Sequence, residues 1–497
     1  MNTCVPLSTH AALSRLSDRS LLRTLGHIGG RWTASPDAAD FVVTDPASGA
    51  PVARVASLGL TETDAAIGAA TAAFPGWRDR LPQERARILR RWGELMLAAT
   101  EDLALIMTLE QGKPLAESRG EIAYAAEFLD WYAGEAPRVN AEGVTPHLPQ
   151  VEMIVRREAL GPVGVVTPWN FPSAMITRKV AAALAAGCTC VVHPSAETPL
   201  SALALAELAE RAGLPAGVLN VVPGDAATIV GAMCADSRLR AMSFTGSSGI
   251  GRLIAAQCAP SMKRLVMELG GHAPLIVFAD ADIDRAVAIA MDAKFATSGQ
   301  DCLAANRIYV ERPLLAAFTE RLAARIAALK VGPGLDPATE VGPLMHDRAL
   351  AKVAAQVEDA RRHGGRIVVG GHVHAEMPLA YMPTLITGAG EGALIHREET
   401  FGPVASILPF DSEAEVIARA NDTEYGLAAY VVTRDGARAL RLSRALEFGM
   451  VAVNRVKITG GPIPFGGWKQ SGLGREGSRH GLEAFTELKY LCIDTAA

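Results

Sequence analysis

The sequence contains no long run of apolar residues, although hydrophobic residues make up 49% of its composition. A helix that crosses a membrane needs about 18 or more successive apolar residues without charges, and no segment reaches that length. Near the N-terminus, Arg15, Asp18, Arg19 and Arg23 stand among the leucines, so this stretch lacks the apolar centre of a secretory signal. We therefore expect a cytoplasmic protein that does not enter a membrane.

An excess of charge of one sign is also missing. The chain has 48 Lys and Arg against 53 Asp and Glu, a formal net charge of -5, and the two signs are interspersed. Neither the basic stripe of a nucleic-acid-binding protein nor the polybasic arm of a membrane-surface protein is present. The expected partners are small molecules and further copies of the chain.

Cysteine is present, but not in the pattern of a disulfide framework. The chain has 7 cysteines, an odd number, scattered over 497 residues, so reduced thiols are expected. Histidines 363, 372 and 374 share a glycine-rich stretch with no Cys or carboxylate at a ligand spacing. We interpret that stretch as a solvated loop and predict no metal site.

A repeated pattern of strand and helix is what the sequence does contain. Residues 188–192 form a short apolar run typical of a buried strand. Thr198 and Pro199 then suit the N-cap and first residue of a helix that ends at Gly213, and a second strand follows at 218–222. Strand, helix and strand within about 35 residues imply a right-handed parallel crossover.

The same alternation continues on both sides of this unit. Residues 61–100 predict helices broken near Pro75 and Pro82, and residues 140–160 predict a projecting hairpin. Beyond residue 267, strands and helices alternate again and predict a second α/β layer. The length allows two or three domains of roughly 100 to 200 residues each.

Cys302 stands in "SGQDCLAANR", on a predicted turn after Gly299 and among small residues. A cysteine attacks substrates as the thiolate, which needs a positive charge, a helix N-terminus or a base nearby. The alternative for this residue is an inert buried cysteine, because free cysteine is among the most buried residue types.

A carboxylate and an amide occupy two other informative positions. Glu268 ends an apolar stretch and precedes two glycines, which suits either a base at a strand end, where α/β active sites form, or an ordinary terminal charge. Asn170 lies in "TPWNFP", held by prolines on both sides. Such a fixed amide can stabilise an oxyanion, although an aromatic turn packed for stability gives the same pattern.

The stretch "FTGSSGIG" at 244–251 predicts a strand, a close backbone approach and a helix N-terminus that favours anions. Its glycines stand at 246, 249 and 251, which is not the GxGxxG dinucleotide fingerprint. A plain glycine-rich turn therefore stays possible on this stretch alone.

These four motifs, with "EETFGP" at 398–403 and "PFGGWKQSGLGREG" at 464–477, together resemble the aldehyde dehydrogenase superfamily. The resemblance covers nearly the whole chain from about residue 28 onward. The stretches "PWNFPSAMITRK" and "SALALAELAERAGLPAGVLNVV" are similar to the succinate-semialdehyde dehydrogenase branch.

By this resemblance, Cys302 attacks the aldehyde and its thiohemiacetal oxyanion is held by Asn170 and the Cys302 main-chain N–H. Hydride transfer to NAD or NADP then leaves a thioester, and Glu268 activates the water that hydrolyses it, a role that needs a raised carboxyl pKa. Lys179 and Glu476 match positions of a proton relay. The implied reaction is non-acylating oxidation of an aldehyde to a carboxylic acid.

The resemblance also implies the contacts to the cofactor. His193 replaces the family's usual lysine at the adenosine ribose, and Ala196 replaces a glutamate frequent in NAD-preferring relatives, so no carboxylate is expected there to repel NADP. The preference between NAD and NADP therefore stays open. The implied cofactor-binding residues are Thr167, Pro168, Trp169, His193, Ser195, Ala196, Gly246, Ser247, Leu269, Glu399 and Phe401.

For the substrate, the branch implies a semialdehyde such as succinate semialdehyde, whose distal carboxylate is held by two arginines and a serine. Arg178 matches the first arginine, but Ala296 stands at the second. Arg455 and Lys457 are expected to supply replacement charge, and Thr459 lies near the serine's place. Loss of one arginine at a buried site costs roughly 1.5 to 3 kcal/mol, enough to favour a different aldehyde. Ala304 replaces a second cysteine, so no disulfide switch with Cys302 is expected.

The fold implied by the resemblance is α/β, with a Rossmann-like cofactor domain, an α/β catalytic domain and a small β oligomerisation hairpin. A homodimer or homotetramer is expected. The expected divisions are 1–139 and 160–266 for the cofactor domain, 140–159 and 484–497 for the oligomerisation strands, and 267–483 for the catalytic domain.

Two other functions compete with the dehydrogenase. Cys302, Asn170 and Glu268 would suffice for a thiol esterase, which would have no use for the glycine-rich stretch or Glu399. A non-catalytic binding protein would have no need to keep both Cys302 and Glu268.

Overall fold

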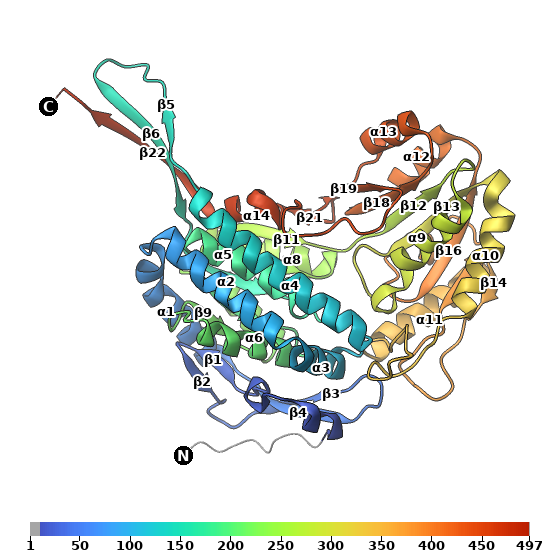
Figure 1. Cartoon of the computed structure of the whole chain (residues 1–497), viewed down its shortest axis with the longest axis horizontal. Coiled ribbons are helices and arrows are strands. Elements are labelled where there is room, and N and C mark those ends of the chain that lie inside the picture. Colours follow the sequence, from blue (N-terminus) through green and yellow to red (C-terminus); the bar gives the residue numbers. More distant parts are fainter. Residues whose placement is uncertain (1–9, 497) are drawn as a thin grey trace.

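The computed structural model describes residues 10–496, which form a two-part body and a projecting arm (Figure 1). Each part of the body contains one large sheet covered by helices, and the arm consists of two long strands and one short strand. Within residues 10–496, no helix has both the length and the apolar character needed to cross a bilayer.

The first sheet has eight strands in the order β2-β1-β9-β8-β7-β10-β11-β21. Its five central strands, from β9 to β11, run parallel, and β1, β2 and β21 are antiparallel additions at the edges. The strands are β1 (Gly26–Ile28), β2 (Arg31–Thr33), β7 (Pro162–Val166), β8 (Thr189–His193), β9 (Leu219–Val221), β10 (Ala241–Thr245), β11 (Arg264–Glu268) and β21 (Gly472–Leu473).

The chain order reverses between β7 and β10. From β7 the chain builds outward through β8 and β9, and it then returns to the other side of β7 to add β10 and β11. The carboxyl ends of the strands at such a reversal leave a crevice, which is where open α/β sheets bind their ligands. The residues that follow β7 and β10 are therefore the place to look for a dinucleotide.

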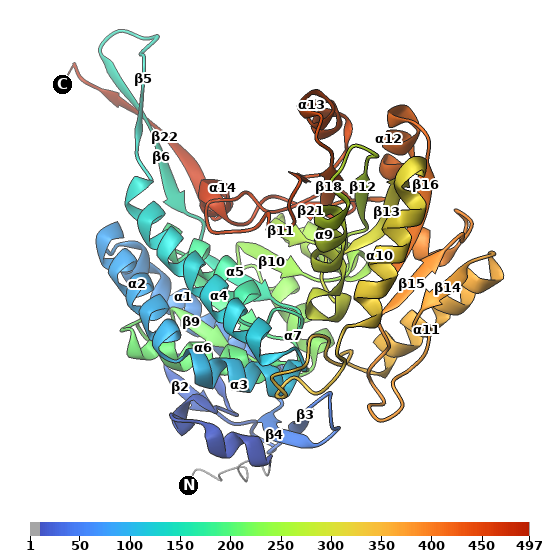
Figure 2. The same ribbon diagram turned by 45° about the vertical axis from the view of Figure 1, so that its right-hand side comes forward.

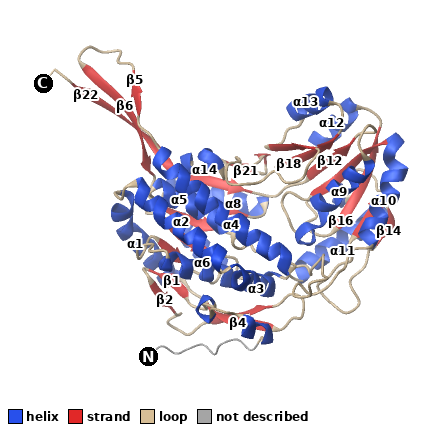
Figure 3. Cartoon of the chain, in the orientation of Figure 1, coloured by secondary structure: helices blue, strands red, loops and turns tan. Residues whose placement is uncertain are grey.

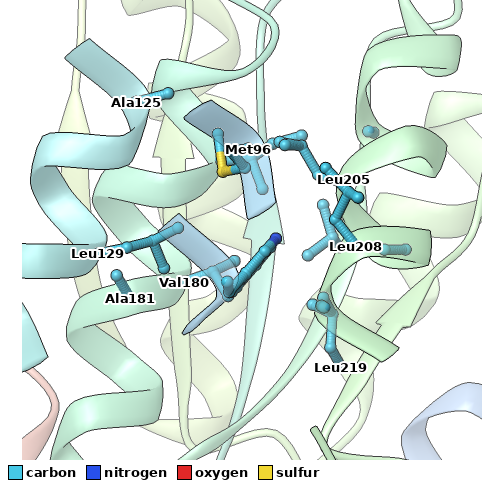
Figure 4. Close-up of a cluster of buried hydrophobic side chains, with 14 of the residues drawn as sticks. Met96, Ala125, Leu129, Val180, Ala181, Leu205, Leu208 and Leu219 are labelled. Carbon is cyan, nitrogen blue, oxygen red and sulfur yellow. The ribbon is translucent and has the colours of Figure 1, made fainter. Parts of the chain in front are cut away.

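Helices cover both faces of the first sheet. One face packs on α1, α7 and α8, and the other on α2 to α6. Figure 4 shows part of the packing between the sheet and helices α2 to α6. There, side chains from four of these helices and one strand are in contact, among them Met96, Leu129, Val180, Leu205 and Leu219. The helices are α1 (Leu60–Arg78), α2 (Pro82–Ala98), α3 (Thr100–Gln111), α4 (Leu115–Glu135), α5 (Ala174–Ala186), α6 (Pro199–Arg211), α7 (Ala226–Ala235), α8 (Ser248–Cys258) and α14 (Ser478–Glu483).

One detail of the predicted helices is wrong. α1 continues through Pro75, because this proline lies in the last turn and its missing N–H removes only one helical hydrogen bond. Thr198 and Pro199 are the N-cap and first residue of α6, as predicted, although the Thr198 side chain makes no cap bond. Glu110 of α3 takes that role, accepting from the main-chain N–H groups of Leu200 (2.7 Å) and Ser201 (2.8 Å).

The second sheet has seven strands in the order β14-β15-β16-β13-β12-β18-β19, all parallel except β14. Helices α9 and α10 pack on one face and α12 and α13 on the other, an arrangement visible in Figures 2 and 3. The strands are β12 (Ala273–Val277), β13 (Ala305–Glu311), β14 (Arg366–Val369), β15 (Thr384–Thr387), β16 (Val404–Phe410), β18 (Ala428–Val432) and β19 (Met450–Val453), and the helices α9 (Ile283–Phe295), α10 (Leu315–Ala327), α11 (Asp347–Arg362), α12 (Glu413–Asn421) and α13 (Gly436–Ala445).

The arm joins β5 (Glu142–Val144), β6 (Val151–Ala159) and the C-terminal β22 (Thr486–Asp494) into an antiparallel sheet. The predicted hairpin is thus present, and Figure 1 shows it extending away from the body.

Two expected domain boundaries need correction. The boundary at 266 falls inside β11, whose pairing with β10 continues to Glu268. Residues 472–483, expected in the catalytic domain, return to the first sheet because β21 pairs with β11 and α14 packs on α4 and α5. The division into domains otherwise stays a prediction.

Candidate active site

A cavity of about 400 Å³ lies between the carboxyl ends of the first sheet and the amino ends of the second. It contains all three residues proposed for the chemistry, Cys302, Glu268 and Asn170, together with most of the expected nicotinamide-side residues. Its lining is Pro168, Trp169, Asn170, Thr245, Gly246, Ser247, Glu268, Leu269, Gly270, Cys302, His346, Arg348, Ala349, Lys352, Glu399, Thr400 and Phe401.

Cys302 is held by a tightly packed turn before β13. Thr297 and Ser298, just upstream, adopt left-handed backbone angles (φ 49° and 56°), which are uncommon for residues with a side chain. A Cβ on Gly271 would lie 2.1 Å from the Cys302 carbonyl oxygen, so only glycine allows this approach. The position of the Cys302 sulfur thus depends on the close contact between its own turn and the Gly271 backbone.

The thiol is neutral in this environment, since burial and the nearby carboxyl groups of Glu268 and Asp301 raise the pKa of Cys302 well above its ordinary value. Burial also raises the pKa of Glu268 to about 7. Neither carboxylate oxygen of Glu268 has a hydrogen-bond partner among residues 10–496. A protonated thiol therefore faces a carboxyl group that can accept a proton near neutral pH.

Asn170 points an amide into the same cavity. Its Nδ2 donates one hydrogen bond to the Gln300 carbonyl at 3.0 Å, which leaves the second N–H of that amide for a ligand. The main-chain carbonyl of Asn170 accepts a hydrogen bond from Lys113 Nζ at 2.7 Å. Lys113 also forms a fully buried ion pair with Glu121, with 2.7 Å between the charged atoms. Glu121 also accepts from the main-chain N–H of Ser173 (2.9 Å), so the loop carrying the amide is fixed to α4.

Lys179 and Glu476 are brought together behind the cavity. Lys179 Nζ donates to Glu476 and to Thr245, which lines the cavity. Burial lowers the pKa of Lys179. Glu476 also pairs with Arg178, with 2.9 Å between Oε2 and Nε. The expected relay residues therefore form one buried network that reaches the cavity through Thr245.

A second pocket of about 960 Å³ continues from the first and shares Pro168, Trp169, Gly246 and Ser247 with it. It lies at the reversal between β7 and β10, and a Cβ on Gly246 would come 2.4 Å from the Phe244 ring. Ser247 caps α8, whose N-terminus faces the pocket. The pocket's size, the close glycine backbone and the helix N-terminus fit a dinucleotide.

The outer end of this pocket contains Thr167, His193, Ser195 and Ala196, all expected cofactor residues. Burial lowers the pKa of His193, whose Nδ1 lies 2.9 Å from the Val222 carbonyl, so the ring is neutral. The expectation that no carboxylate lies there is wrong, because Glu197 and Asp225 both line the pocket beside Ala196. The next residue along the chain supplies the charge that position 196 lacks.

Aromatic rings form the wall on the nicotinamide side. Trp169 meets Phe401 edge-to-face, with ring centroids 5.5 Å apart, and Phe401 has a left-handed backbone (φ 54°). Glu399 accepts from the Gly271 N–H at 2.9 Å, and burial raises the pKa of Glu399 to about 7. Both residues line the cavity, and their contacts with a cofactor stay a prediction.

The expected substrate residues separate into two groups. Arg178 is fully buried, with its guanidinium carbon 4.1 Å from the Phe465 ring centroid, and Thr459 and Arg178 are both neighbours of the Tyr124 phenol. Arg455 and Lys457 are exposed and line a different pocket, which shares no residue with the Cys302 cavity. Their role at the substrate stays a prediction, and the neighbouring Val456 and Ile458 pack partly buried against the core of the second sheet.

Several residues of the site were not predicted from the sequence. His346, Arg348 and Lys352 enter the cavity from α11 and the residue before it, and nothing in the helical pattern of that segment separates them from surface residues. Lys113 precedes α4, and Glu121 stands among several other charged residues of that helix, so the sequence gives no signal for their buried ion pair. No group of three His, Cys, Asp or Glu within residues 10–496 has the arrangement of a metal site.

Comparison with known proteins agrees with this geometry. The model of the aldehyde dehydrogenase family matches residues 32–491. A non-phosphorylating aspartate-semialdehyde dehydrogenase of Halomonas elongata is 50% identical, with 97% of each chain covered. An NADP-dependent succinate-semialdehyde dehydrogenase of Escherichia coli is 47% identical, covering 96% of this chain and 99% of that one.

Solved structures give the same result. The crystal structure of succinate-semialdehyde dehydrogenase from Burkholderia pseudomallei superposes with a TM-score of 0.96 at 48% identity, covering 97% of this chain and 100% of that chain. With a cysteine, a carboxylate and an amide at the inner end of a dinucleotide-shaped pocket, the chain belongs to the aldehyde dehydrogenase family.

Proposed function

We propose that this protein oxidises a small semialdehyde with a distal carboxylate to the acid, with NAD or NADP as the hydride acceptor. The main support for the proposal is that Cys302, Glu268 and Asn170 line one cavity, which continues into the larger pocket at the carboxyl ends of β7 and β10.

The first step is activation of the nucleophile. Glu268 takes the proton of the Cys302 thiol, and the sulfur forms a bond to the aldehyde carbon. The oxyanion that results accepts hydrogen bonds from the free Asn170 N–H and from the Cys302 main-chain N–H, which has no acceptor among residues 10–496. Fixed donors of this kind contribute about 2.7 to 4 kcal/mol each to transition-state stabilisation.

A dinucleotide held in the second pocket would accept the hydride from the thiohemiacetal carbon, and Cys302 would then hold a thioester. Glu268 first releases the thiol proton to the network of Lys179 and Glu476, which reaches the cavity through Thr245. Glu268 then removes a proton from the attacking water, the bond between the acyl carbon and the Cys302 sulfur breaks, and the acid is released. The reaction therefore needs one carboxyl group whose pKa lies near neutrality, which burial supplies.

The distal carboxylate of the substrate is assigned to Arg178, with the hydroxyl groups of Tyr124 and Thr459 as further donors. Arg178 shares its charge with Glu476, so it binds a monoanion more weakly than an unpaired arginine would. The Halomonas and Escherichia relatives act on aspartate and succinate semialdehydes by name, and this chain resembles them to a similar degree. Four-carbon semialdehydes with and without an amino group are accordingly the substrates to compare.

The test follows nicotinamide reduction with succinate, aspartate and glutarate semialdehydes, each with NAD and with NADP. We expect reduction with at least one of them, and its loss in Cys302→Ala. Ester cleavage without nicotinamide reduction would instead identify a thiol hydrolase, and no turnover of any aldehyde would contradict the proposal.

The arm is proposed to join copies of the chain into a dimer or tetramer, since its three strands have no covering layer of their own. All six cysteines within the described residues are free, which fits an enzyme of the reducing cytoplasm.

A further inference from the structure

A buried arginine near the nucleophile has no part in the proposed reaction. Arg307 lies on β13, shortly after Cys302, and is 1% exposed. All the hydrogen-bond acceptors that its guanidinium contacts within residues 10–496 are neutral oxygens. A buried charge without a carboxylate partner is costly, so its presence needs an explanation.

The guanidinium connects two segments that are distant in the sequence. Its Nε and one terminal nitrogen donate to the His272 carbonyl at 3.2 and 3.0 Å. The terminal nitrogens also donate to the carbonyls of Arg419 (3.1 Å) and Ala420 (2.9 Å). Both carbonyls belong to the last turn of α12, whose partial negative charge favours a cation. The charge of Arg307 is thereby stabilised, and the His272 peptide is fixed to the end of α12.

The backbone ladder between β12 and β13 is interrupted at this point. The adjacent residues Ala273 and Pro274 of β12 pair with residues 305 and 307 of β13, which leaves Asn306 as the extra residue of a β-bulge. Pro274 also lacks the N–H that a strand residue would donate. The side chain of Arg307 therefore supplies hydrogen-bond donors where the sheet has lost them.

The position of the His272 peptide matters because its neighbour Gly271 contacts the active site twice. A Cβ on Gly271 would lie 2.1 Å from the Cys302 carbonyl oxygen, so the two backbones are in close contact. The Gly271 N–H also donates to Glu399 at 2.9 Å. A shift of the His272 carbonyl would therefore be passed on to the turn of the nucleophile and to a carboxyl group that lines the cavity.

We propose that Arg307 is a positioning residue, which keeps Gly271 in place and thereby fixes the Cys302 main chain and Glu399 for the reaction. The main-chain N–H of Cys302 is one of the two proposed oxyanion donors, so a small displacement of this turn lowers the rate. The effect on turnover rests on the proposed function, whereas the effect on the thiol does not.

The first experiment removes the guanidinium but keeps a long side chain, in Arg307→Met of the full chain. We expect kcat for a semialdehyde to fall about tenfold to 100-fold, because the oxyanion donor loses its fixed position. The KM for NAD or NADP should rise as well, because Glu399 loses a fixed N–H donor. Steady-state kinetics measures both constants.

A second readout needs neither an aldehyde nor a dinucleotide. Iodoacetamide alkylates a thiol as the thiolate, so its rate at Cys302 reports whether Glu268 still lies in place to take the thiol proton. In Arg307→Met we expect this rate at neutral pH to fall about tenfold or more, and its rise with pH to move toward the alkaline range of an ordinary thiol. Peptide mass spectrometry separates Cys302 from the other cysteines.

Arg85→Met is the matched control. Arg85 is also buried, at 6% exposed, and its guanidinium likewise donates to main-chain carbonyls, those of Ala185 (3.3 Å), Arg78 (3.1 Å) and Arg80 (2.6 Å). It lies on α2 and lines neither pocket of the active site. Both variants should have a lower melting temperature, but Arg85→Met should keep the kcat and the alkylation rate of the wild type.

If Arg307→Met does not fold, Arg307→Lys takes its place. A single nitrogen cannot contact His272 and both carbonyls of α12 as the three nitrogens of a guanidinium do, so the same losses are expected at a smaller size. The melting temperature shows whether each variant is folded.

Each result supports or overturns the inference. A lower melting temperature with unchanged kcat and alkylation rate would mean that Arg307 serves only the stability of the fold. Equal losses in the Arg85 and Arg307 variants would overturn the proposal too, since loosened packing would account for both. A lower kcat with an unchanged KM for the dinucleotide would remove Glu399 from it. If the wild type reduces no nicotinamide, the proposed function fails instead, and the alkylation rates still test the position of the thiol.

Discussion

At the scale of single residues, the site depends on the ionisation of Glu268. This carboxyl group works as a base only when ionised, and burial raises its pKa to about 7. Below that pH it is mostly protonated, so kcat should rise with pH through about 7 and then level off. In Glu268→Gln the rate should fall by about 100- to 10,000-fold and lose this pH dependence. A profile of kcat between acidic and alkaline pH checks the prediction, and an unchanged profile in the variant would assign the base elsewhere.

His193 governs the choice between NAD and NADP at the same scale. The neutral ring and the carboxylates of Glu197 and Asp225 offer no attraction to a 2′-phosphate, so NAD should be preferred. His193→Lys adds an ammonium group at that end of the pocket, where one charged hydrogen bond contributes about 1.5 to 3 kcal/mol. We expect the KM for NADP to fall about tenfold and the KM for NAD to change much less. Steady-state kinetics with both cofactors measures this, and an unchanged ratio would show that the phosphate lies elsewhere.

The three residues proposed for the chemistry could be predicted because the signal for each one lies in its immediate sequence neighbours. Cys302, Glu268 and Asn170 each stand where a turn or strand end is readable from glycines, prolines and an apolar run, and the structure brings all three to one cavity. The exposure of Arg455 and Lys457 could not be predicted, because alternation along an extended segment decides which side chains face inward, and a shift of one residue reverses it. Glu197 was missed because the loop after β8 does not alternate, and both residue 196 and residue 197 line the pocket.

At the scale of secondary-structure elements, α4 supports the loop that carries Asn170. The buried Lys113–Glu121 pair connects the start of α4 to that loop. Glu121→Gln leaves Lys113 without its counter-charge, and breaking such a pair costs about 3 to 5 kcal/mol. We expect a lower melting temperature and a fall of at least about tenfold in kcat, because the amide loses its fixed position.

The control for that variant is an exposed ion pair between α3 and α4. Arg119 pairs with Glu101 at 2.7 Å, but both side chains are largely exposed, so Glu101→Gln should change stability by less than about 1 kcal/mol. Thermal unfolding and kinetics of the two variants compare a buried and an exposed pair. Equal effects would contradict a positioning role for Glu121.

The strands were easier to predict than their connections. The runs at 188–192, 218–222 and 241–244 are apolar on both faces, as strands covered by helices on both sides must be, and each forms a strand of the first sheet. The N-cap position of α6 was predicted correctly, but the acceptor of its first N–H groups, Glu110, could not be, because it comes from 90 residues away. The return of residues 472–483 to the first sheet likewise depends on a pairing with β11 that no local pattern contains.

At the scale of the whole molecule, the arm cannot be stable in isolation. It has three strands, no second layer, and exposed apolar side chains at Leu488 (60%) and Tyr490 (53%). Small sheets of this kind need an apolar partner face, and monomers rarely expose such patches. A second copy of the chain supplies that face in the proposed dimer or tetramer.

Charges on the arm should therefore dissociate the assembly without unfolding the body. We expect Leu488→Asp with Tyr490→Asp to give monomers, as measured by light scattering, because burying two carboxylates in an apolar interface is strongly unfavourable. Leu97→Asp is the control, since Leu97 is 52% exposed on α2, outside the arm, and its variant should keep the wild-type mass.

The arm is also connected to the relay residues. Strand β6 is followed by β7, and β22 follows α14, which packs on the helix carrying Arg178 and Lys179. Loss of the interface should then loosen the relay as well, so that the monomer has a lower kcat while its KM for the dinucleotide stays close to that of the assembled enzyme. A variant that remains oligomeric would show that other surfaces hold the copies together.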